Sequence, residues 1–248
     1  MPNRQQNPNS ILVLISGNGS NLQAIIDGCQ RGHIPAQVCA VISNIAGAGG
    51  LERARRAGID ALELPHRDYP TRQAYDAALT QIIDRYTPSL IALAGFMRIL
   101  SADFVRRYAG KILNIHPSLL PKYRGLHTHQ RALEAGDTEQ GATVHFVTAT
   151  LDGGPPILQG KVPIRPGDDP ESLGERVRTT VEHRIYPLAI RWHLQNRLHL
   201  TARGAELDGA PLPPTGQIYA PATPPHPKNP PQKEGTRADH GLLSWNRV

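Results

Sequence analysis

The sequence predicts an α/β protein with a Rossmann-like, mostly parallel sheet, helices on both faces and an antiparallel C-terminal part. Aliphatic runs of strand length alternate with stretches whose apolar residues recur at i, i+3, i+4 and i+7. The runs are continuous, which is typical of strands that are buried on both faces. After residue 140 the alternation gives way to two successive strand-like runs around a Gly-Gly-Pro turn. These observations together predict the fold class.

The first repeat of the pattern runs from residue 11 to Cys29. Residues 11–15 form a continuous aliphatic run, and Leu22, Ile25, Ile26 and Cys29 form the helical stripe that follows. The same alternation continues to residue 115. The later strands are expected at 38–42, 61–64, 90–94 and 111–115, and the later helices at 51–57, 75–86 and 102–108.

The C-terminal part has a different pattern. Residues 143–148 and 157–164 are predicted to be antiparallel strands, and a long helix should carry Leu173, Val177 and Ile185. We therefore expect one catalytic domain over residues 11–210.

The two ends of the chain are expected to lie outside this domain. Residues 1–10 are polar and predicted to be flexible. Nine of the 23 prolines fall between residues 211 and 231, in a stretch with few aliphatic residues. Such a segment buries too little apolar surface to offset its ordering entropy, so residues 211–248 are predicted to be a disordered tail.

Composition excludes several classes of protein. The apolar runs of this 248-residue chain are shorter than the roughly 18–20 residues that cross a bilayer, and the N-terminus lacks an apolar signal core. A cytoplasmic location without membrane contact is therefore expected, and Cys29 and Cys39 should be free core thiols. The formal net charge of +6 suits anionic ligands, but the basic residues are scattered, so no nucleic-acid partner is expected. The oligomeric state is left open between monomer and homodimer.

A loop of small polar residues, 16–21, joins the first strand to its helix. Such a loop lets backbone N–H groups approach an anion at the positive end of the helix dipole. It lacks the third glycine of the dinucleotide pattern and the Gly-Lys-Ser/Thr of a Walker loop, which argues against NAD and ATP. The alternatives are a phosphate site, or a tight turn in which Ser20 or Asn21 caps the helix.

Asn114 and His116 are two residues apart on a predicted strand. Side chains alternate along a strand, so this amide and imidazole should face the same space. Such a pair can stabilise a developing oxyanion, as acyl transfer requires. In the alternative interpretation, Asn114 is a turn former and His116 a surface residue at the strand end.

Asp152 begins Asp-Gly-Gly-Pro, which predicts either a hairpin turn or an acid/base partner for His116 from across the sheet. His127 and His129 have no Cys or carboxylate companions at ligand spacing, so no metal site is expected.

Seven sequence blocks within residues 11–195 together resemble the folate-dependent phosphoribosylglycinamide formyltransferase family of purine biosynthesis. They are ISGNGSNLQAII, SN with LERARRAGI, LAGFMRILS, LNIHPSLLPKYRGLHTH, GATVHFVT, LDGGPPILQGKVPI and EHRIYPL. HPSLLP with a downstream Asp is shared across a wider formyltransferase superfamily, whereas SGNGSNLQ is typical of the glycinamide ribonucleotide branch. The family pattern often has a branched aliphatic residue where this chain has Pro156, and the basic, proline-rich residues after 215 have no recognised counterpart in it.

The resemblance implies an enzyme with the formyltransferase fold. It would transfer the formyl group of 10-formyltetrahydrofolate, its co-substrate, to the amine of glycinamide ribonucleotide, without a metal. The catalytic residues would be Asn114, His116 and Asp152. The remaining roles are phosphate binding by Gly19, Ser20 and Asn21, glycinamide contact by Glu182, and folate binding by Arg72, Met97, Arg98, Ile99, Leu100 and Val147. A mobile loop over residues 123–129 is also implied.

Two other functions stay open at this point. One is formyl transfer to another amine such as methionyl-tRNA. The other is a non-catalytic basic module that binds RNA or a membrane through its tail.

Overall fold

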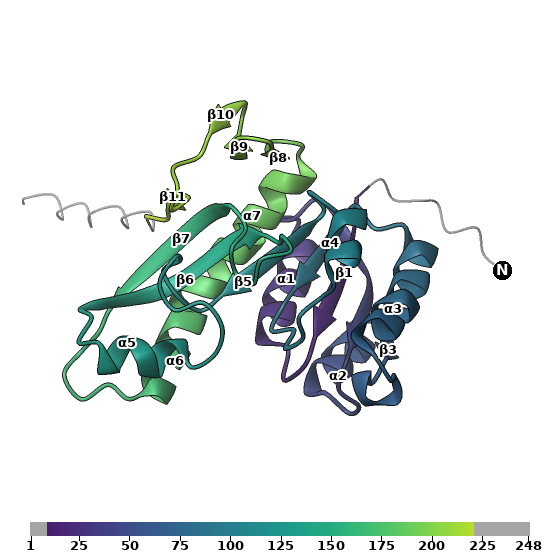
Figure 1. Ribbon diagram of the computed structural model, residues 1–248, viewed down its shortest axis with the longest axis horizontal. Helices are drawn as coiled ribbons and strands as arrows, with labels where there is room; N and C mark the ends of the chain where they lie inside the picture. Colours follow the sequence, from purple (N-terminus) through teal and green to yellow (C-terminus); the bar gives the residue numbers. More distant parts are fainter. Residues whose placement is uncertain (1–8, 221–248) are drawn as a thin grey trace, which may run out of the picture.

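The computed structural model describes residues 9–220. The predicted flexible N-terminus, apart from its last two residues, and most of the predicted tail lie outside the described residues. The chain alternates strands and helices up to residue 116 and then turns to an antiparallel arrangement (Figure 1). This confirms the predicted fold class.

An eight-stranded sheet is the centre of the fold, with the strand order β11-β7-β6-β5-β4-β1-β2-β3. From β3 to β5 the neighbouring strands are parallel, whereas β6 is antiparallel to both β5 and β7. The strands are β1 (Ser10–Ile15), β2 (Gln37–Ser43), β3 (Asp60–Glu63), β4 (Leu90–Leu93), β5 (Ile112–His116), β6 (Glu139–Phe146), β7 (Pro156–Pro163) and β11 (Gln217–Ile218).

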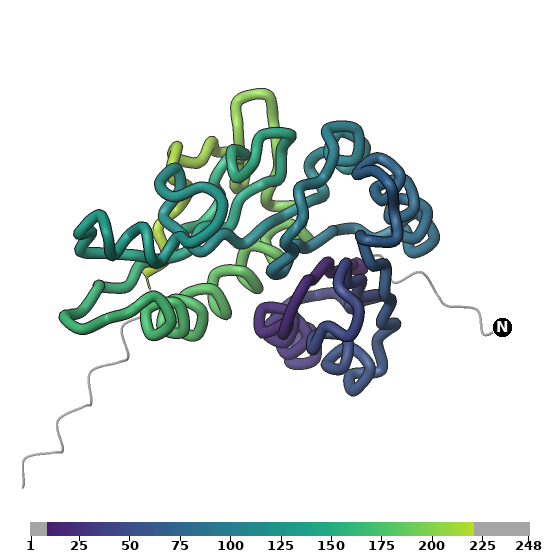
Figure 2. Tube along the Cα trace, turned by 60° about the horizontal axis from the view of Figure 1, so that its bottom comes forward, coloured from purple at the N-terminus to yellow at the C-terminus, as the bar shows by residue number. Residues whose placement is uncertain are grey.

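Helices cover both faces of this sheet. They are α1 (Ser20–Gln30), α2 (Gly49–Arg56), α3 (Arg72–Tyr86), α4 (Ala102–Arg107), α5 (Thr128–Glu134), α6 (Pro170–Val177) and α7 (His183–Leu194), with a short 3-10 turn η1 (His66–Asp68). Figure 2 shows that β6, β7, α5 and α6 form one end of the molecule, and β2, β3, α2 and α3 the other.

Two apolar cores result from the alternation of side chains along the strands. In β1, Ile11 and Val13 pack toward α1, α2 and α7, while Leu12 and Leu14 pack toward α3 and α4. All four are fully buried. The continuous aliphatic run in the sequence is therefore explained by a strand with helices on both sides.

The predicted long C-terminal helix is divided into three parts. A π-helical turn, η2 (Arg178–Glu182), lies between α6 and α7. Pro187 in α7 has no N–H to offer the carbonyl of His183, directly after this turn. Pi-helical turns are frequent at functional sites, and Glu182 at the end of this one lines a cavity described below.

A small sheet that the sequence pattern did not predict follows α7. It consists of β8 (Leu198–Thr201), β9 (Gly204–Leu207) and β10 (Ala210–Pro211). The predicted domain boundary at residue 210 falls within β10, and β11 then pairs with β7 in the large sheet. Within residues 9–220, none of the helices is long and apolar enough to span a membrane.

Tyr186 links α7 to the centre of the sheet. Its buried hydroxyl lies 2.9 Å from the carbonyl oxygen of Leu93 on β4 and 3.0 Å from that of Leu113 on β5. We expect Tyr186→Phe to lower the free energy of unfolding by about 1–3 kcal/mol, because it removes the donor from two buried carbonyls. Urea unfolding measures this. Tyr86→Phe, whose hydroxyl donates to Asp60 in a less buried position, should cost less; equal costs would contradict the assigned role of Tyr186.

Candidate active site

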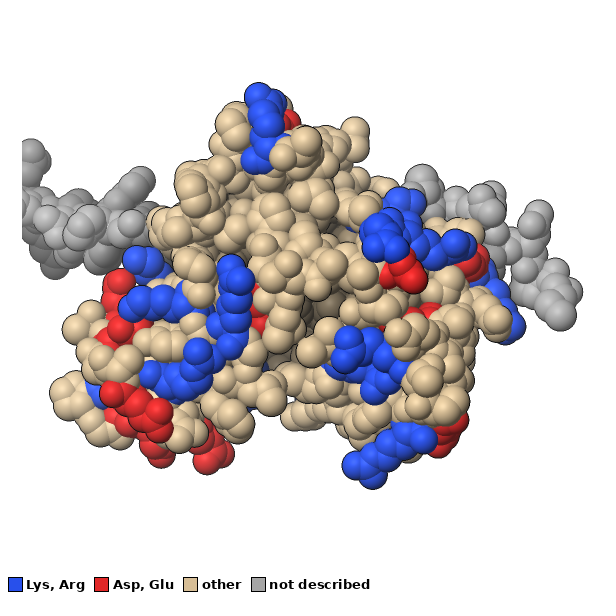
Figure 3. Space-filling model, in the orientation of Figure 1, with Lys and Arg blue, Asp and Glu red and all other residues tan. Residues whose placement is uncertain are grey.

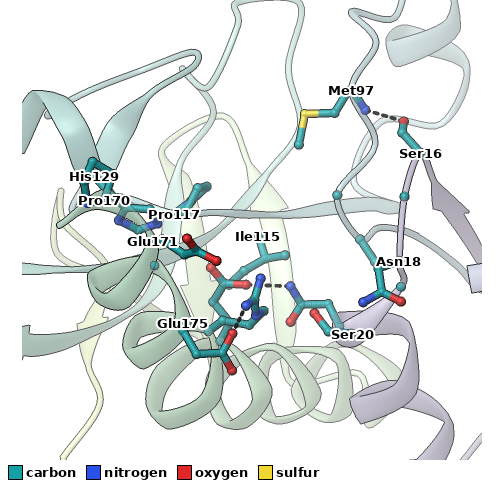
Figure 4. Close-up of a pocket in the computed structure, with 18 residues that line it drawn as sticks. Ser16, Asn18, Ser20, Met97, Ile115, Pro117, His129, Pro170, Glu171 and Glu175 are labelled. Carbon is teal, nitrogen blue, oxygen red and sulfur yellow. Dashed lines mark hydrogen bonds and ion pairs between the residues drawn. The ribbon is translucent and has the colours of Figure 1, made fainter. Parts of the chain in front are cut away.

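The carboxyl ends of β1, β4 and β5 lie at one edge of the sheet, because these strands are parallel neighbours. The loops that follow them begin at Ser16, Ala94 and Pro117. Ligands of open α/β sheets bind at this edge. Ser16 ties two of the loops together, since its Oγ accepts a hydrogen bond of 2.7 Å from the Met97 N–H (Figure 4).

The loop of residues 16–21 has the form of an anion site. Gly19 is the N-cap of α1 and has φ 74°, a left-handed conformation that favours glycine. In the described part of the chain no side chain caps this helix, so the turn in which Ser20 or Asn21 is the cap is not formed. Gly17 and Asn18 are exposed. The first N–H groups of α1 are therefore available to a ligand.

A cavity of about 560 Å³ opens beside this loop. In Figure 4, Asn18 and Ser20 lie on one side of it, and His129 and Pro170 on the other. Arg178 and Glu182 also line it, both from η2. Figure 3 shows the hollow in this region of the surface, with lysine and arginine side chains on either side. The combination of a loop, a cation and a carboxylate suits a phosphorylated substrate with an amine.

Glu182 is buried and faces the loop. Its Oε2 accepts a 2.6 Å hydrogen bond from Asn21 Nδ2. Burial raises the pKa of the Glu182 carboxyl, while the Asn21 hydrogen bond and the charge of Arg178 act in the opposite direction. The structure therefore brings Glu182 to the same cavity as Gly19, Ser20 and Asn21, although about 160 residues separate them.

The predicted trio Asn114, His116 and Asp152 converges beside this cavity. His116 Nδ1 lies 3.4 Å from Asp152 Oδ2, and both side chains are less than a tenth exposed. Asn114 approaches the same carboxylate through His145: Asn114 Nδ2 is 3.1 Å from His145 Nε2, which is 3.8 Å from Asp152 Oδ1. The site thus holds an amide, two imidazoles and a carboxylate.

The backbone explains how Asp152 reaches this position. Asp152 has φ 46°, and the following loop is drawn tightly against the end of β6, since a Cβ on Gly154 would lie 1.8 Å from the Phe146 carbonyl oxygen. Asp152 Oδ2 also accepts a hydrogen bond of 2.9 Å from the Gly125 N–H. A second loop contact involves His116, whose Nε2 is 2.9 Å from the Tyr123 carbonyl oxygen.

His145 is a member of this cluster that the sequence reasoning missed. It lies on β6 directly opposite Asn114. Its Nδ1 is 2.8 Å from the Phe146 carbonyl oxygen, which can only accept, so the neutral ring carries its proton on Nδ1 and accepts from Asn114 at Nε2. Burial lowers the pKa of His145 to about 4. The neutral ring thus orients the Asn114 amide.

The buried neutral state of His145 makes stability depend on pH. The unfolded chain takes up a proton near pH 6.5, whereas the folded chain takes it up only near pH 4. The unfolded state therefore binds more protons between these values, and the free energy of unfolding should fall by roughly 2–3 kcal/mol as pH drops from 6.5 to 4. About one unit above pH 6.5 the unfolded chain also releases this proton, and the contribution then becomes constant.

Chemical denaturation at several pH values measures this dependence in the wild type and in His145→Gln. The difference between the two stability profiles gives the contribution of His145 alone. Other groups with shifted pKa values are present in both proteins and cancel: Glu182, whose pKa burial raises, and His129, His183 and His193, whose pKa values burial lowers. Replacing the exposed His33 is the control. Parallel profiles for the wild type and His145→Gln would contradict the assignment.

A second, smaller cavity of about 80 Å³ adjoins the cluster of Asn114, His145 and Asp152. Four residues predicted to bind folate line it: Arg98, Ile99, Leu100 and Val147. Asn114, His145 and Asp152 line it too, so a ligand here would contact these three side chains. Its mixture of apolar walls with a few polar atoms suits a heteroaromatic ring.

The other two residues predicted to bind folate lie elsewhere. Met97 lines the larger cavity, and 68% of its surface is exposed. Arg72 is the first residue of α3, is exposed, and is absent from the described lining of both cavities. Arg98 lies over the ring of Tyr75, one turn of α3 from Arg72, with 4.7 Å from its Cζ to the ring centroid.

Among residues 9–220 there is no group of three His, Cys, Asp or Glu side chains that could hold a metal ion.

Three comparisons show which known proteins this chain resembles. A family model described as formyl transferase matches residues 9–190. The chain is 58% identical over 207 residues to phosphoribosylglycinamide formyltransferase of Escherichia coli K12, covering 84% of this chain and 97% of that protein. It is 45% identical over 194 residues to the human trifunctional purine biosynthetic protein adenosine-3, covering 78% of this chain and 19% of that protein. The solved structure of phosphoribosylglycinamide formyltransferase from Coxiella burnetii superposes with a TM-score of 0.82 at 50% identity, covering 86% of this chain and 99% of that one.

Proposed function

The chain belongs to the formyl transferase family, and on that premise we propose that it transfers the formyl group of 10-formyltetrahydrofolate to the amine of glycinamide ribonucleotide. The products are formylglycinamide ribonucleotide and tetrahydrofolate, in purine biosynthesis. The observation that carries this proposal is the convergence of Asn114, His116 and Asp152 between a cavity with a phosphate-type loop and a second, partly apolar cavity.

The larger cavity binds the ribonucleotide. The phosphate of the ribonucleotide accepts hydrogen bonds from the backbone N–H groups of Gly19, Ser20 and Asn21, where the dipole of α1 favours a negative charge. Glu182 contacts the glycinamide part. Holding the phosphate at one end places the amine at the other end, beside the catalytic cluster, and such positioning contributes several kcal/mol to catalysis.

The folate binds from the opposite side. Its pterin ring occupies the smaller cavity, among Arg98, Ile99, Leu100 and Val147. Arg72 and Met97 are the other predicted folate contacts. This brings the formyl carbon between the two cavities, where the cluster lies.

The reaction is a direct transfer between two nitrogens. The substrate amine attacks the formyl carbon, and the Asn114 amide and the His116 ring donate hydrogen bonds to the oxyanion that forms. Asp152 orients His116 and accepts the proton that leaves the amine, directly or through water. The carbon–N10 bond then breaks, and the proton goes to N10 of the departing tetrahydrofolate. No covalent bond to the protein forms.

The position of Tyr123 is relevant to this mechanism. Its carbonyl oxygen lies 2.9 Å from His116 Nε2 and so occupies the place of an acceptor. In the reaction the formyl oxygen replaces it, which requires the loop that begins at Tyr123 to shift when substrates bind. The sequence resemblance likewise implies a mobile loop over residues 123–129.

Formyl transfer can be followed spectroscopically with 10-formyltetrahydrofolate as donor and glycinamide ribonucleotide as acceptor. We expect turnover with this acceptor and none with methionyl-tRNA, the alternative acceptor. The reverse preference, or no transfer to either, would refute the proposal. The cytoplasmic location, the absence of nucleic-acid, membrane and metal partners, and the monomeric or homodimeric state stay predictions.

A further inference from the structure

We infer that Arg53 of α2 is a positioning residue, which shapes the loop of residues 16–21 for the substrate phosphate without touching the phosphate itself. The inference rests on the proposed function. Arg53 is absent from the described lining of the larger cavity, whereas its guanidinium contacts Asn18 of the loop.

The first observation concerns the carbonyl groups of the loop. Three consecutive carbonyl oxygens each accept a hydrogen bond: that of Gly17 from the Gly50 N–H at 3.0 Å, that of Asn18 from Arg53 Nε at 2.7 Å, and that of Gly19 from the Gln23 N–H at 2.9 Å. A free carbonyl dipole would repel an anion nearby. Because all three are held by donors, the loop can present its N–H groups to the cavity.

The second observation is the way Arg53 grips the loop. Besides its Nε contact, Arg53 Nη2 donates to Asn18 Oδ1 at 3.2 Å, and Nη1 donates to Gln23 Oε1 at 3.4 Å. One planar guanidinium therefore holds the backbone and side chain of Asn18 and reaches into α1. A lysine has a single ammonium on a flexible stem and cannot reproduce this fork.

The third observation is that α2 approaches the loop at backbone distance. A Cβ on Gly19 would lie 2.8 Å from the Gly50 Cα, and a Cβ on Gly50 would lie 2.5 Å from the Ile15 Cδ1. The start of α2 is thus packed directly on the loop, which fixes the distance between Arg53 and Asn18. Adding a side chain at Gly19 or Gly50 would therefore disturb the packing of α2 on the loop, whereas replacing Arg53 with a side chain of similar or smaller size would not.

The test uses Arg53→Met and Arg53→Lys in the full chain, with Arg56→Met as the matched control. Arg56 lies three positions after Arg53 on the same helix, is exposed, and pairs with Glu52 rather than with the loop. We expect Arg53→Met to raise KM for glycinamide ribonucleotide about tenfold, while kcat and KM for the folate stay within about twofold. Arg53→Lys should recover less than half of the loss, and Arg56→Met should behave as the wild type.

An acceptor without the phosphate, glycinamide riboside, gives the decisive comparison. Arg53→Met should leave kcat/KM for this acceptor unchanged, because the loop then has no phosphate to hold. Equal losses for both acceptors, an unchanged KM for the ribonucleotide, or full recovery in Arg53→Lys would each overturn the inference.

Binding of ribose 5-phosphate, measured by calorimetry, tests the inference independently of turnover. The wild type should bind it about tenfold more tightly than Arg53→Met does. If the wild type shows no formyl transfer, the proposed function fails while this measurement still decides the role of Arg53. If ribose 5-phosphate binds both proteins equally, or binds neither, the inference about Arg53 fails.

Discussion

Replacing Asp152 with Asn is expected to lower kcat for formyl transfer by about 10²–10⁴-fold, with little change in either KM. The carboxylate lies 3.4 Å from His116 Nδ1 and is mostly buried. Asn has the same shape and can still accept the Gly125 hydrogen bond, so the loop should keep its conformation. It cannot take a proton from the substrate amine, and this capacity matters only as the reaction proceeds.

Steady-state kinetics of Asp152→Asn measure this effect, and the thermal unfolding midpoint checks that the fold is intact. Asp103→Asn is the control, since Asp103 is an exposed carboxylate paired with Arg106 on α4. A kcat within twofold of the wild type would remove Asp152 from the mechanism.

His116→Ala is the second variant with a large expected effect, a loss of about 10²–10³-fold in kcat. In the proposed mechanism the imidazole is one of the two groups that donate to the developing oxyanion, and it is 6% exposed. Its contribution should appear in kcat more than in KM, because the oxyanion exists in the transition state and not in the bound substrate. The same kinetic assay measures it. His33→Ala, at an exposed position, should be silent; a loss confined to KM would mean that His116 only binds substrate.

Much of the fold follows from patterns that the sequence displays. The continuous run at residues 11–15 predicts a strand covered on both faces. This is the case for β1, because its two neighbours are parallel to it and the helices that connect parallel strands cover both faces of the sheet. The small sheet β8 to β10 and the helix α5 were not predicted. Their segments are short and carry few apolar residues in a periodic order, so local pattern does not distinguish them from loops.

In the candidate site, too, the local pattern predicts some contacts, whereas others depend on tertiary packing. The alternation along β5 predicts that Asn114 and His116 face one space, and the structure agrees. The meeting of Asp152 with His116 depends on the left-handed backbone at Asp152 and on the close packing at Gly154. His145 depends on the register that sets it opposite Asn114. Neither can be derived from spacing, because pairing across a sheet is a tertiary property.

Glu182 and Arg53 are two further side chains whose contacts with the loop of residues 16–21 do not follow from local sequence patterns. A π-helical turn ends at Glu182, which reaches Asn21 in the loop, and the sequence contains no local signal for such a turn. Arg53 is one of three arginines within four residues, and only the structure distinguishes it, through its contacts with Asn18.

The most direct test of the central claim is the single-turnover rate of formyl transfer in the triple variant Asn114→Ala, His116→Ala, Asp152→Asn. We expect the triple variant to be about as slow as the slowest single variant, because in the proposed mechanism the three side chains serve one transition state as a unit. A rate reduced by the product of the three single losses would show that they act independently, and an unimpaired rate would place the chemistry elsewhere in the chain.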